Sequence, residues 1–429
     1  MKNSYSLAVK ELEKFHYMPE PGRMRTDELA RALAARGNPQ LAYGRAQVIG
    51  TNGKGAAAYF LARILEAHGV KTGLYTSPHL VSYCERIAAG GRRISETEFG
   101  ALYFSLKPVF EKFRLTQFER LTLMAAEFFK TERVEFAVLE TGLGGTGDAV
   151  TALAAPLLLY TAVTPEHRDL LGPSLRQIAG AKAGPLSAAE TAFSCRQPFK
   201  CVAAMLRARA RSGGASLEFC VPPAEITLRR RGVSFKFGRH AYRIAVFGAP
   251  AALNAGLALR AAAHILGARF RTAFARRALA GGVWEWRLQV VRYPGCNPLL
   301  VSCAHNDASL DADLAAIKEM AAAGILPGRM SVLFGVSGNR DSRRLLRKAA
   351  KAFDDITVTE VPGSAGAFEK MRGLARRLTG VRVVKDCRAA TRLVVGPEPE
   401  RKRFAAVIGS IYLAGAALSF AGGGAAGKD

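Results

Sequence analysis

The stretch Ala46-Gln-Val-Ile-Gly-Thr-Asn-Gly-Lys-Gly55 decides the fold of this chain. Ala46–Ile49 is a run typical of a buried strand, and the residues from Ala56 onward favour a helix. A glycine-rich turn between a strand and a helix points backbone N–H groups at phosphate, and the helix N-terminus adds partial positive charge. Lys54 is placed to reach the β- and γ-phosphates of a nucleotide. The predicted phosphate-binding loop consists of Gly50, Thr51, Asn52, Gly53, Lys54 and Gly55.

The spacing of this loop is shorter than that of the common G-x-x-x-x-G-K-[ST] pattern. Taken alone, the segment therefore leaves an ordinary glycine-rich turn as the alternative. The rest of the sequence has to decide between the two.

Strand-length apolar runs alternate with amphipathic helical segments, which predicts an α/β fold with a mainly parallel sheet. The expected strands are Ala46–Ile49, Val134–Glu140, Leu157–Val163, Leu299–Cys303, Ser331–Phe334, Ile356–Thr359 and Ala405–Ile408. The expected helices are Gly55–His68, Glu96–Leu106, Thr116–Thr131, Ala252–Leu266, Ser309–Ala323 and Ser342–Phe353. Alternating apolar residues between Phe219 and Phe247 predict an antiparallel excursion.

The length of 429 residues indicates two domains, since single cores usually stop growing at about 250–300 residues. A second α/β series begins after Gly281-Gly282. We place the boundary near Gly282–Pro294, where two glycines, a Trp-rich segment and Tyr-Pro-Gly occur together. The predicted domains are residues 1–285, which carry the phosphate-binding loop, and residues 286–429.

The chain is strongly basic, with 61 Lys and Arg against 35 Asp and Glu and a formal net charge of +26. Such a surface attracts polyanions, including nucleotides, polycarboxylates and nucleic acid. The basic residues are spread along the chain and are not interleaved with aromatics, so charge alone does not predict a nucleic-acid-binding protein.

The cysteines and the apolar segments indicate the compartment. Seven scattered cysteines without a C-x-x-C pair argue against a disulfide framework or a structural zinc site and favour a reducing cytoplasm. The start of the chain lacks the apolar core of a signal peptide. The uncharged stretch Phe404–Gly427 is expected to form a short strand, a turn and a helix rather than a membrane span.

Further motifs follow the loop in a fixed order. The first are Leu74-Tyr-Thr-Ser-Pro-His-Leu80, Glu85-Arg86-Ile87, Thr116-x-Phe118-Glu119, Leu139-Glu-x-Gly-Leu-Gly-Gly145 with Asp148-Ala149, and Lys182-Ala-Gly184. The later ones are Asn254, Trp284-x-Trp-Arg287, Ala304-His305-Asn306, Phe334-Gly335 with Asp341, and Gly409-Ser-x-Tyr-Leu413. This series resembles the folylpolyglutamate synthase/dihydrofolate synthase family, a branch of the Mur-ligase-like ATP-dependent amide ligases. The resemblance runs from about Val48 to Leu413, nearly the whole chain.

The resemblance implies a Mur-ligase-like ATPase domain with a P-loop, followed by a C-terminal Rossmann-like glutamate-ligase domain. Members of this family use ATP to convert a carboxylate into an acyl phosphate, which the amine of L-glutamate attacks. The implied function is an ATP- and Mg²⁺-dependent ligase acting on a folate or dihydropteroate carboxylate, with K⁺ as a further candidate ion. The implied protein is a cytoplasmic monomer that acts on small molecules, without a membrane or nucleic-acid partner.

Glu140 ends an apolar strand just before the turn Gly142–Gly145, where ligands bind in open α/β sheets, and Mg²⁺ prefers oxygen ligands. The resemblance makes Glu140 a Mg²⁺ ligand and His167 a second metal ligand. A solvated strand-end Glu and a structural His are the alternatives. Lys182 matches the lysine that is carbamylated in this family, and an ordinary helix-end lysine is the alternative.

The resemblance also implies the other site residues, and it places the site in a cleft between the domains. The implied substrate-binding residues are Ser77, Pro78 and His79 beside the pterin pocket, and Ser410 in the second domain. The implied nucleotide contacts outside the loop are Asn254 and Arg287. The implied catalytic residues are Lys54, Lys182 and His305.

The chain departs from the family pattern at several site positions. Ala56 replaces a Ser or Thr whose hydroxyl binds Mg²⁺, and Ser302-Cys303 replaces Asp-Gly before Ala304-His305-Asn306. The other replacements are Thr146-Gly147 for Arg-Leu, Val150-Thr151 for Thr-Asn, Glu166 for Asp, and Pro250-Ala251 for His-Gln. These changes leave three hypotheses open: an active folate ligase, a Mur-like ligase with another substrate, or a catalytically weakened nucleotide- or folate-binding paralogue.

Overall fold

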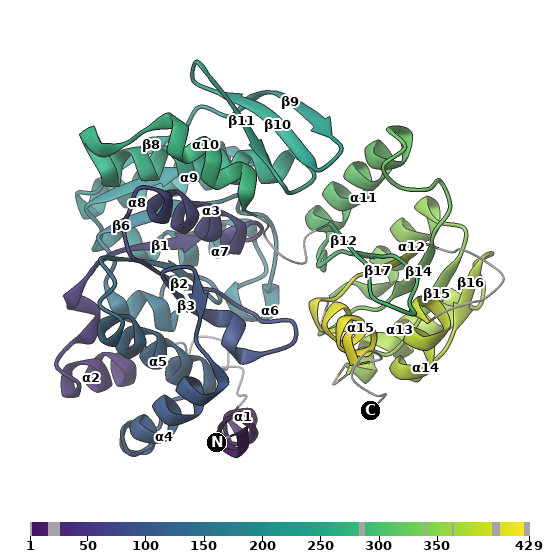
Figure 1. The fold of residues 1–429 in the computed structure, drawn as a ribbon, viewed down its shortest axis with the longest axis horizontal. Coiled ribbons are helices and arrows are strands. Elements are labelled where there is room, and N and C mark those ends of the chain that lie inside the picture. Colours follow the sequence, from purple (N-terminus) through teal and green to yellow (C-terminus); the bar gives the residue numbers. More distant parts are fainter. Residues whose placement is uncertain are drawn as a thin grey trace. The chain divides into compact units, whose positions relative to one another are not determined.

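The computed structural model describes residues 2–15, 26–282, 288–338, 340–362, 364–396 and 404–423. The chain divides into two compact units, which are coloured purple to teal and green to yellow for the most part in Figure 1. The first unit comprises Met1–Glu225, Phe235–Arg243 and Ala251–Gly282, and the second comprises Ile226–Ser234, Ile244–Pro250 and Val283–Asp429. The predicted boundary between residues 285 and 286 falls outside the described residues and stays a prediction.

The first unit is built on an eight-stranded sheet with the order β4-β3-β2-β5-β1-β6-β7-β8. Its strands are β1 (Gly44–Ile49), β2 (Thr72–Tyr75), β3 (Ile87–Ala89), β4 (Arg92–Arg93), β5 (Phe136–Glu140), β6 (Leu157–Tyr160), β7 (Thr191–Ser194) and β8 (Ser216–Phe219). Every pairing from β2 across to β8 is parallel, while β3 pairs antiparallel with β2 and β4. The predicted α/β fold with a mainly parallel sheet is therefore confirmed.

Helices cover this sheet, and capping side chains start several of them. The helices are α1 (Lys2–Lys14), α2 (Asp27–Ala35), α3 (Lys54–Ala67), α4 (Glu96–Lys112), α5 (Gln117–Thr131), α6 (Arg168–Leu171), α7 (Leu175–Ala183), α8 (Lys200–Gly213), α9 (Ala249–Leu266) and α10 (Thr272–Gly281). Capping boxes begin α4, α5 and α7, where a Ser or Thr and a Glu or Gln three residues later bind each other's backbone N–H. Figure 1 shows α3 and α5 on opposite sides of the sheet.

Two apolar cores hold helices on this sheet. In one, α4 and α5 pack against side chains of β2 and β5, including the fully buried Tyr75 and Leu139. In the other, α7 and α8 pack against β6 and β7 around Tyr160 and Leu206. The central strand β1 pairs with β5 and β6, one strand from each of these two cores.

A three-stranded sheet follows at the position of the expected antiparallel excursion. Its strands are β9 (Ala224–Arg229), β10 (Gly232–Phe237) and β11 (His240–Ile244), in the order β11-β10-β9. Two-residue connections join them, and connections this short join antiparallel strands. Gly232 has φ +123°, and a Cβ there would lie 2.0 Å from the carbonyl oxygen of Ile244, so this position requires glycine.

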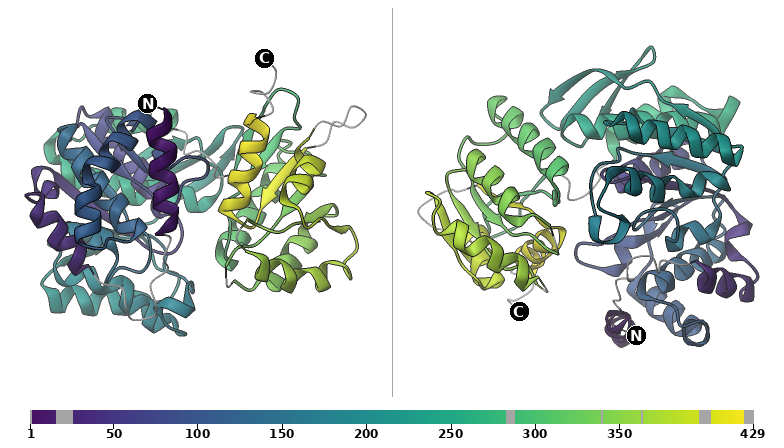
Figure 2. Two further views of the ribbon diagram at one scale, coloured as in Figure 1. Left: turned by 90° about the horizontal axis from the view of Figure 1, so that it is seen from below. Right: turned by 180° about the vertical axis from the view of Figure 1, so that it is seen from behind.

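The second unit has a six-stranded sheet with the order β12-β13-β17-β14-β15-β16, parallel except for the β12–β13 pair. Its strands are β12 (Gln289–Val291), β13 (Leu299–Val301), β14 (Ser331–Phe334), β15 (Ile356–Val358), β16 (Val381–Val383) and β17 (Ala405–Ile408). Its helices are α11 (Asp307–Ala322), α12 (Ser342–Ala352), α13 (Ala365–Ala375), α14 (Cys387–Val395) and α15 (Ile411–Gly423). Within this unit α12 packs on α11 and α13, and α14 packs on α15. Figure 2 shows the green-to-yellow part of the chain from two further sides. The predicted strand, turn and helix after Phe404 correspond to β17 and α15.

Several predicted ends differ from the structure by a few residues, and two of these differences have a clear physical reason. The helix expected to stop at Leu106 continues to Lys112 with Pro108 inside it, because Phe110 in the added turn is fully buried. The strand expected to reach Val163 ends at Tyr160, because Ala162 and Thr164 instead bind the loop after β1.

One helix among the described residues is long and apolar enough to cross a membrane by length and composition, within Ala249–Arg269. Its most apolar window is 56% buried inside the fold. It comprises α9, whose buried residues include Leu257 and Ala258, so it has the properties of a core helix.

Candidate functional site

The predicted phosphate-binding loop lies at the carboxyl end of β1, in the middle of the sheet, and α3 begins directly after it at Lys54. Two positions of the loop require glycine because neighbouring side chains lie very close to the backbone there. Gly50 has φ +154°, and a Cβ there would lie 2.0 Å from Oγ1 of Thr161. Gly53 has φ +85°, and a Cβ there would lie 2.3 Å from Nδ2 of Asn254. The loop therefore fits its neighbours only without side chains at these positions.

Thr51 fixes the loop to the segment that follows β6. Its backbone N–H donates to the carbonyl of Ala162 at 2.9 Å, and its Oγ1 donates to the carbonyl of Thr164 at 3.0 Å. The N–H of Thr164 donates to the same Oγ1 at 3.0 Å. These three bonds tie the loop to the segment after β6, and a loop that is already fixed loses less entropy on binding.

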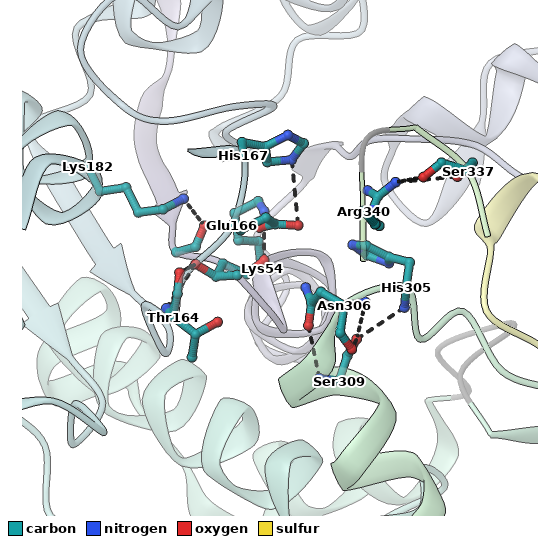
Figure 3. A network of polar contacts seen from close by, with 12 residues as sticks. Lys54, Thr164, Glu166, His167, Lys182, His305, Asn306, Ser309, Ser337 and Arg340 are labelled. Carbon is teal, nitrogen blue, oxygen red and sulfur yellow. Dashed lines mark hydrogen bonds and ion pairs between the residues drawn. The ribbon is translucent and has the colours of Figure 1, made fainter. Parts of the chain in front are cut away.

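Lys54 and Asn254 both lie against the loop, and their role in nucleotide binding stays a prediction. Nζ of Lys54 donates to the carbonyl of Thr51 at 3.1 Å, so the side chain folds back over the loop (Figure 3). Asn254, from α9, is buried and contacts Gly53. A cation, an amide side chain and a helix N-terminus therefore converge on Gly50–Lys54, which is the chemistry that binds phosphate.

Glu140 connects the loop region to the predicted pterin-binding segment. It ends β5 and is paired in register with Val48 of β1, so it lies one strand away from the loop. Its side chain is 5% exposed, and Oε2 accepts a hydrogen bond of 2.9 Å from the N–H of Ser77. The structure thus joins the predicted metal ligand to the segment Ser77-Pro78-His79.

His79 is held as a neutral hydrogen-bond acceptor. Nε of Arg86 donates to its Nδ1 at 2.8 Å, and its ring centroid lies 4.1 Å from that of Tyr83. Burial, together with the nearby Arg86 charge, lowers the pKa of His79 to about 3. The imidazole therefore stays uncharged over the physiological pH range.

Lys182 lies at the end of α7 with its side chain turned toward the loop. Nζ donates to the carbonyl of Gly50 at 2.6 Å, and the residue is 2% exposed. Burial, and then repulsion by Lys54, lowers the pKa of Lys182 to about 7, against the attraction of Glu166 and Asp148. A substantial fraction of Lys182 is therefore a neutral, nucleophilic amine near pH 7.

Asp148, which the sequence marked only as part of a motif, is buried near Lys54 and Lys182. Its Oδ2 accepts from the N–H of Leu143 at 2.7 Å and its Oδ1 from the N–H of Val150 at 2.9 Å. Burial raises the pKa of Asp148 to about 6. The two hydrogen bonds and the charges of Lys54 and Lys182 lower the pKa, but less than burial raises it. Its electrostatic coupling to both lysines places it in the same site.

His167 stands beside Glu166, with Nε2 3.5 Å from Oε1 of Glu166 (Figure 3). Its φ of +48° places it in the left-handed region, where it precedes α6. Within the ranges that the structure describes, no cluster of three or more His, Cys, Asp or Glu residues could hold a metal ion. Mg²⁺ commonly binds through one or two carboxylates plus substrate phosphates and water, and the buried Glu140 beside the loop fits that requirement. His167 offers nitrogen, and its role as a metal ligand stays a prediction.

Several departures from the family pattern are accommodated by local hydrogen bonds. The N–H and Oγ1 of Thr146 both donate to the carbonyl of Ala181, at 2.8 and 3.1 Å. Oγ1 of Thr151 donates to the carbonyl of Gly145 at 2.8 Å. The turn after β5 is thereby tied to α7, which carries Lys182. Ala56 lies in the first turn of α3, where its methyl group offers no ligand to a metal.

In the second unit, the turn after β13 carries His305. Its Nδ1 lies 2.9 Å from the carbonyl oxygen of Cys303, and its backbone N–H donates to Oγ of Ser309 at 3.1 Å. Asn306 caps α11 by accepting from the N–H of Ser309 at 2.9 Å. Figure 3 shows His305, Asn306 and Ser309 gathered at this helix start.

Ser410 follows β17 and is fully buried. Its Oγ lies 3.2 Å from Oγ of Ser337, and Nη1 of Arg340 donates to the carbonyl of Ser337 at 2.6 Å. Ser337 and Arg340 were not predicted as site residues, although they closely follow the Phe334-Gly335 landmark. Arg287 lies outside the described residues.

No protein-family model matches the chain. The dihydrofolate synthase/folylpolyglutamate synthase of Bacillus subtilis (strain 168) is 28% identical over 358 residues, which cover 78% of this chain and 79% of that protein. The folylpolyglutamate synthase of Lacticaseibacillus casei is 27% identical over 385 residues, which cover 85% of this chain and 87% of that protein. The structure of Mycobacterium tuberculosis folylpolyglutamate synthase complexed with ADP matches with a TM-score of 0.84 and 26% identity over 100% of both chains. These similarities extend over most of the chain, whose sequence and fold are therefore similar to those of the folylpolyglutamate synthase/dihydrofolate synthase family.

Proposed function

We propose that this protein is an ATP- and Mg²⁺-dependent ligase that adds L-glutamate to a folate or dihydropteroate carboxylate through an acyl phosphate. The observation that carries the proposal is the preformed loop Gly50–Lys54, with Lys54 folded over it and Asn254 against it. The names of the Bacillus subtilis and Lacticaseibacillus casei relatives support the folate and glutamate chemistry.

ATP is the proposed nucleotide. The loop amides and Lys54 neutralise and orient the transferring phosphate, since positioning and charge stabilisation dominate phosphoryl transfer. The similar Mycobacterium tuberculosis enzyme is complexed with ADP. Arg287 is proposed as a further nucleotide contact on the family resemblance alone.

Mg²⁺ would be held through Glu140 and would neutralise charge on the phosphates. Glu140 fits because it is buried, adjacent to the loop, and fixed by the Ser77 N–H. His167 is proposed as a second metal ligand and K⁺ as a further ion, both on the resemblance. The Ser77-Pro78-His79 segment is proposed to border the pterin pocket.

Lys182 is proposed to carry a carbamate. The ammonium first loses one proton to solvent; the neutral amine then attacks CO₂, an N–C bond forms, one C=O π bond opens, and a second proton leaves to solvent, so the cation becomes an anionic carbamate. The burial and the Lys54 repulsion that lower its pKa to about 7 make the attacking form available. Incubation with ¹³C-bicarbonate and carbon NMR tests this; a carbamate signal that persists in Lys182→Met contradicts the assignment.

The incoming glutamate is proposed to meet His305 and Ser410 in the second unit. Arg340 extends this assignment, because a guanidinium beside the two buried hydroxyls of Ser337 and Ser410 suits a carboxylate. The protein is proposed to be cytoplasmic and monomeric. Its seven cysteines are free thiols, which fits a reducing compartment.

A turnover assay tests the function. Purified protein receives ATP, Mg²⁺, L-glutamate and either a tetrahydrofolate or dihydropteroate, and released phosphate and ligated product are measured. Product from dihydropteroate indicates dihydrofolate synthase activity, and product from the folate indicates tail extension. ATP binding without turnover on either acceptor would instead support a binding paralogue, the second candidate that Ala56 and Ser302 favour.

A further inference from the structure

A buried hydroxyl occupies the carboxyl end of β13 in the second unit. Ser302 is fully buried, and its N–H donates to the carbonyl of Val407 in β17 at 3.0 Å. Its Oγ donates to Oδ2 of Asp313 at 2.6 Å and accepts from the N–H of Ala304 at 3.2 Å. Ser302 therefore links a carboxylate to the backbone of the turn that leads to His305.

The carboxylate comes from α11 rather than from the strand. Asp307 and Asp311 on the same helix pair with Lys348 of α12, at 2.7 Å each. Asp313 instead reaches back to the end of β13, where Ser302 stands in place of the aspartate expected from the family pattern. The short Ser302–Asp313 bond is charge-assisted, the stronger class of hydrogen bond.

The same turn fixes the hydrogen position on His305. The carbonyl of Cys303 can only accept, so the Nδ1 that lies 2.9 Å from it carries the hydrogen. In the neutral ring the lone pair is then on Nε2, which is the hydrogen-bond acceptor. Cys303, the residue that sets this tautomer, lies directly between Ser302 and the Ala304 N–H that Ser302 binds.

We propose that Asp313 is a positioning residue for amide formation. Its carboxylate, acting through the Ser302 hydroxyl, fixes the turn Cys303–His305 and keeps Nε2 of His305 as a proton acceptor. This rests on the proposed ligase function. In that reaction the glutamate nitrogen bonds to the acyl carbon and the C–O bond to phosphate breaks. The ammonium group of glutamate loses two protons. His305 accepts the proton that leaves first; in the end one of the two protons is on phosphate and the other in solvent.

The test moves the carboxylate between the helix and the strand. The variants are Asp313→Ala, the double variant Ser302→Asp with Asp313→Ala, and the control Asp311→Ala, which removes an exposed carboxylate from the same helix. The readouts are kcat, the KM for ATP, and the tautomer of His305 from histidine-ring ¹⁵N shifts. Asp313→Ala is expected to lower kcat about 10- to 100-fold, as for a small misplacement of a reacting group, with the KM for ATP unchanged. It also mixes the His305 tautomers.

The double variant is expected to regain kcat and the single tautomer, and Asp311→Ala to match the wild type. Wild-type kcat and tautomer in Asp313→Ala overturn the inference, as does a double variant no better than Asp313→Ala. A wild-type protein that ligates neither acceptor overturns the proposed function instead. The tautomer comparison still decides the positioning role in that case, because it needs no turnover.

Discussion

Nζ of Lys182 donates a hydrogen bond of 2.6 Å to the carbonyl oxygen of Gly50, across 132 residues of sequence. The end of α7 thereby holds the first residue of the phosphate-binding loop. Since both partners are buried, this bond couples the charge state of Lys182 to the shape of the loop.

Lys182→Met is expected to abolish turnover and to flatten the pH dependence of stability. The pKa of Lys182 is about 7 in the folded protein against 10.5 as its ordinary value. Between these two values the unfolded chain binds more protons here, so the Lys182 contribution to the free energy of unfolding rises with pH. The slope is at most about 1.4 kcal/mol per pH unit. Urea unfolding of the wild type and of Lys182→Met from pH 6.5 upward checks this. If the free energy of unfolding changes with pH in the same way in both proteins, the lowered pKa is contradicted.

Lys54→Ala is expected to reduce turnover by at least about a hundredfold, because it removes the cation that faces the phosphates. The fold should survive, since the Lys54 side chain contributes one hydrogen bond, to the Thr51 carbonyl of its own loop. Lys71→Ala is the matched control, since its side chain is 44% exposed and pairs with Glu132. Steady-state kinetics and thermal unfolding are the measurements. An unchanged rate would refute the placement of the γ-phosphate.

Glu140→Gln is expected to raise the Mg²⁺ concentration needed for half-maximal activity. The amide oxygen of Gln still accepts from the Ser77 N–H, so the fold keeps this bond while the anionic ligand is lost. Titrating Mg²⁺ at saturating ATP measures the shift. The same half-saturation point in both proteins would remove Glu140 from the metal site.

Ala56→Ser is expected to lower the Mg²⁺ requirement, because it supplies a hydroxyl in the first turn of α3. Ala57→Ser places the same group at the next, fully buried position and serves as the control. That control should lose stability without changing the Mg²⁺ response, since a buried hydroxyl needs a partner. If both variants give the same Mg²⁺ titration, Ala56 does not face the metal.

Gly53→Ala is expected to weaken ATP binding at least about tenfold, because its Cβ would overlap Asn254 and displace the loop. Gly69→Ala isolates the backbone strain. Gly69 has φ +80°, close to the +85° of Gly53, but a Cβ there meets nothing within 4 Å. Both variants should lose about 1–2 kcal/mol of stability from the left-handed backbone. ATP affinity is measured by calorimetry. If Gly69→Ala binds ATP as weakly as Gly53→Ala, backbone strain alone explains the loss of affinity.

The strands that the sequence predicted are the buried ones. β1, β14 and β17 are continuous buried runs at the centres of their sheets, and such runs stand out in the sequence. Strands such as β8 and β16 were not predicted, because they are short, lie toward sheet edges and contain exposed residues. Burial alone did not separate the two groups, because the interior strands β2 and β7 are mostly buried and were also not predicted.

The sequence pointed to candidate site residues but did not show their partners. Lys54 and Glu140 could be predicted because a loop between strand and helix and a strand-end carboxylate are local features. The lowered pKa of Lys182 and the raised pKa of Asp148 come from burial and from charges that other elements contribute. Burial and charge at a point in space are not local properties of the sequence.

By itself, the sequence determined the strand–loop–helix unit around Gly50–Gly55, the mainly parallel α/β fold and the order of the family motifs. Only the tertiary structure decided which groups meet: the Asn254 side chain at Gly53, the Ser77 N–H at Glu140, and the Ser302 hydroxyl at Asp313. The physical reason is range. Strand and helix periodicity acts over a few residues, whereas these contacts depend on the strand order and on helices packed from distant parts of the chain.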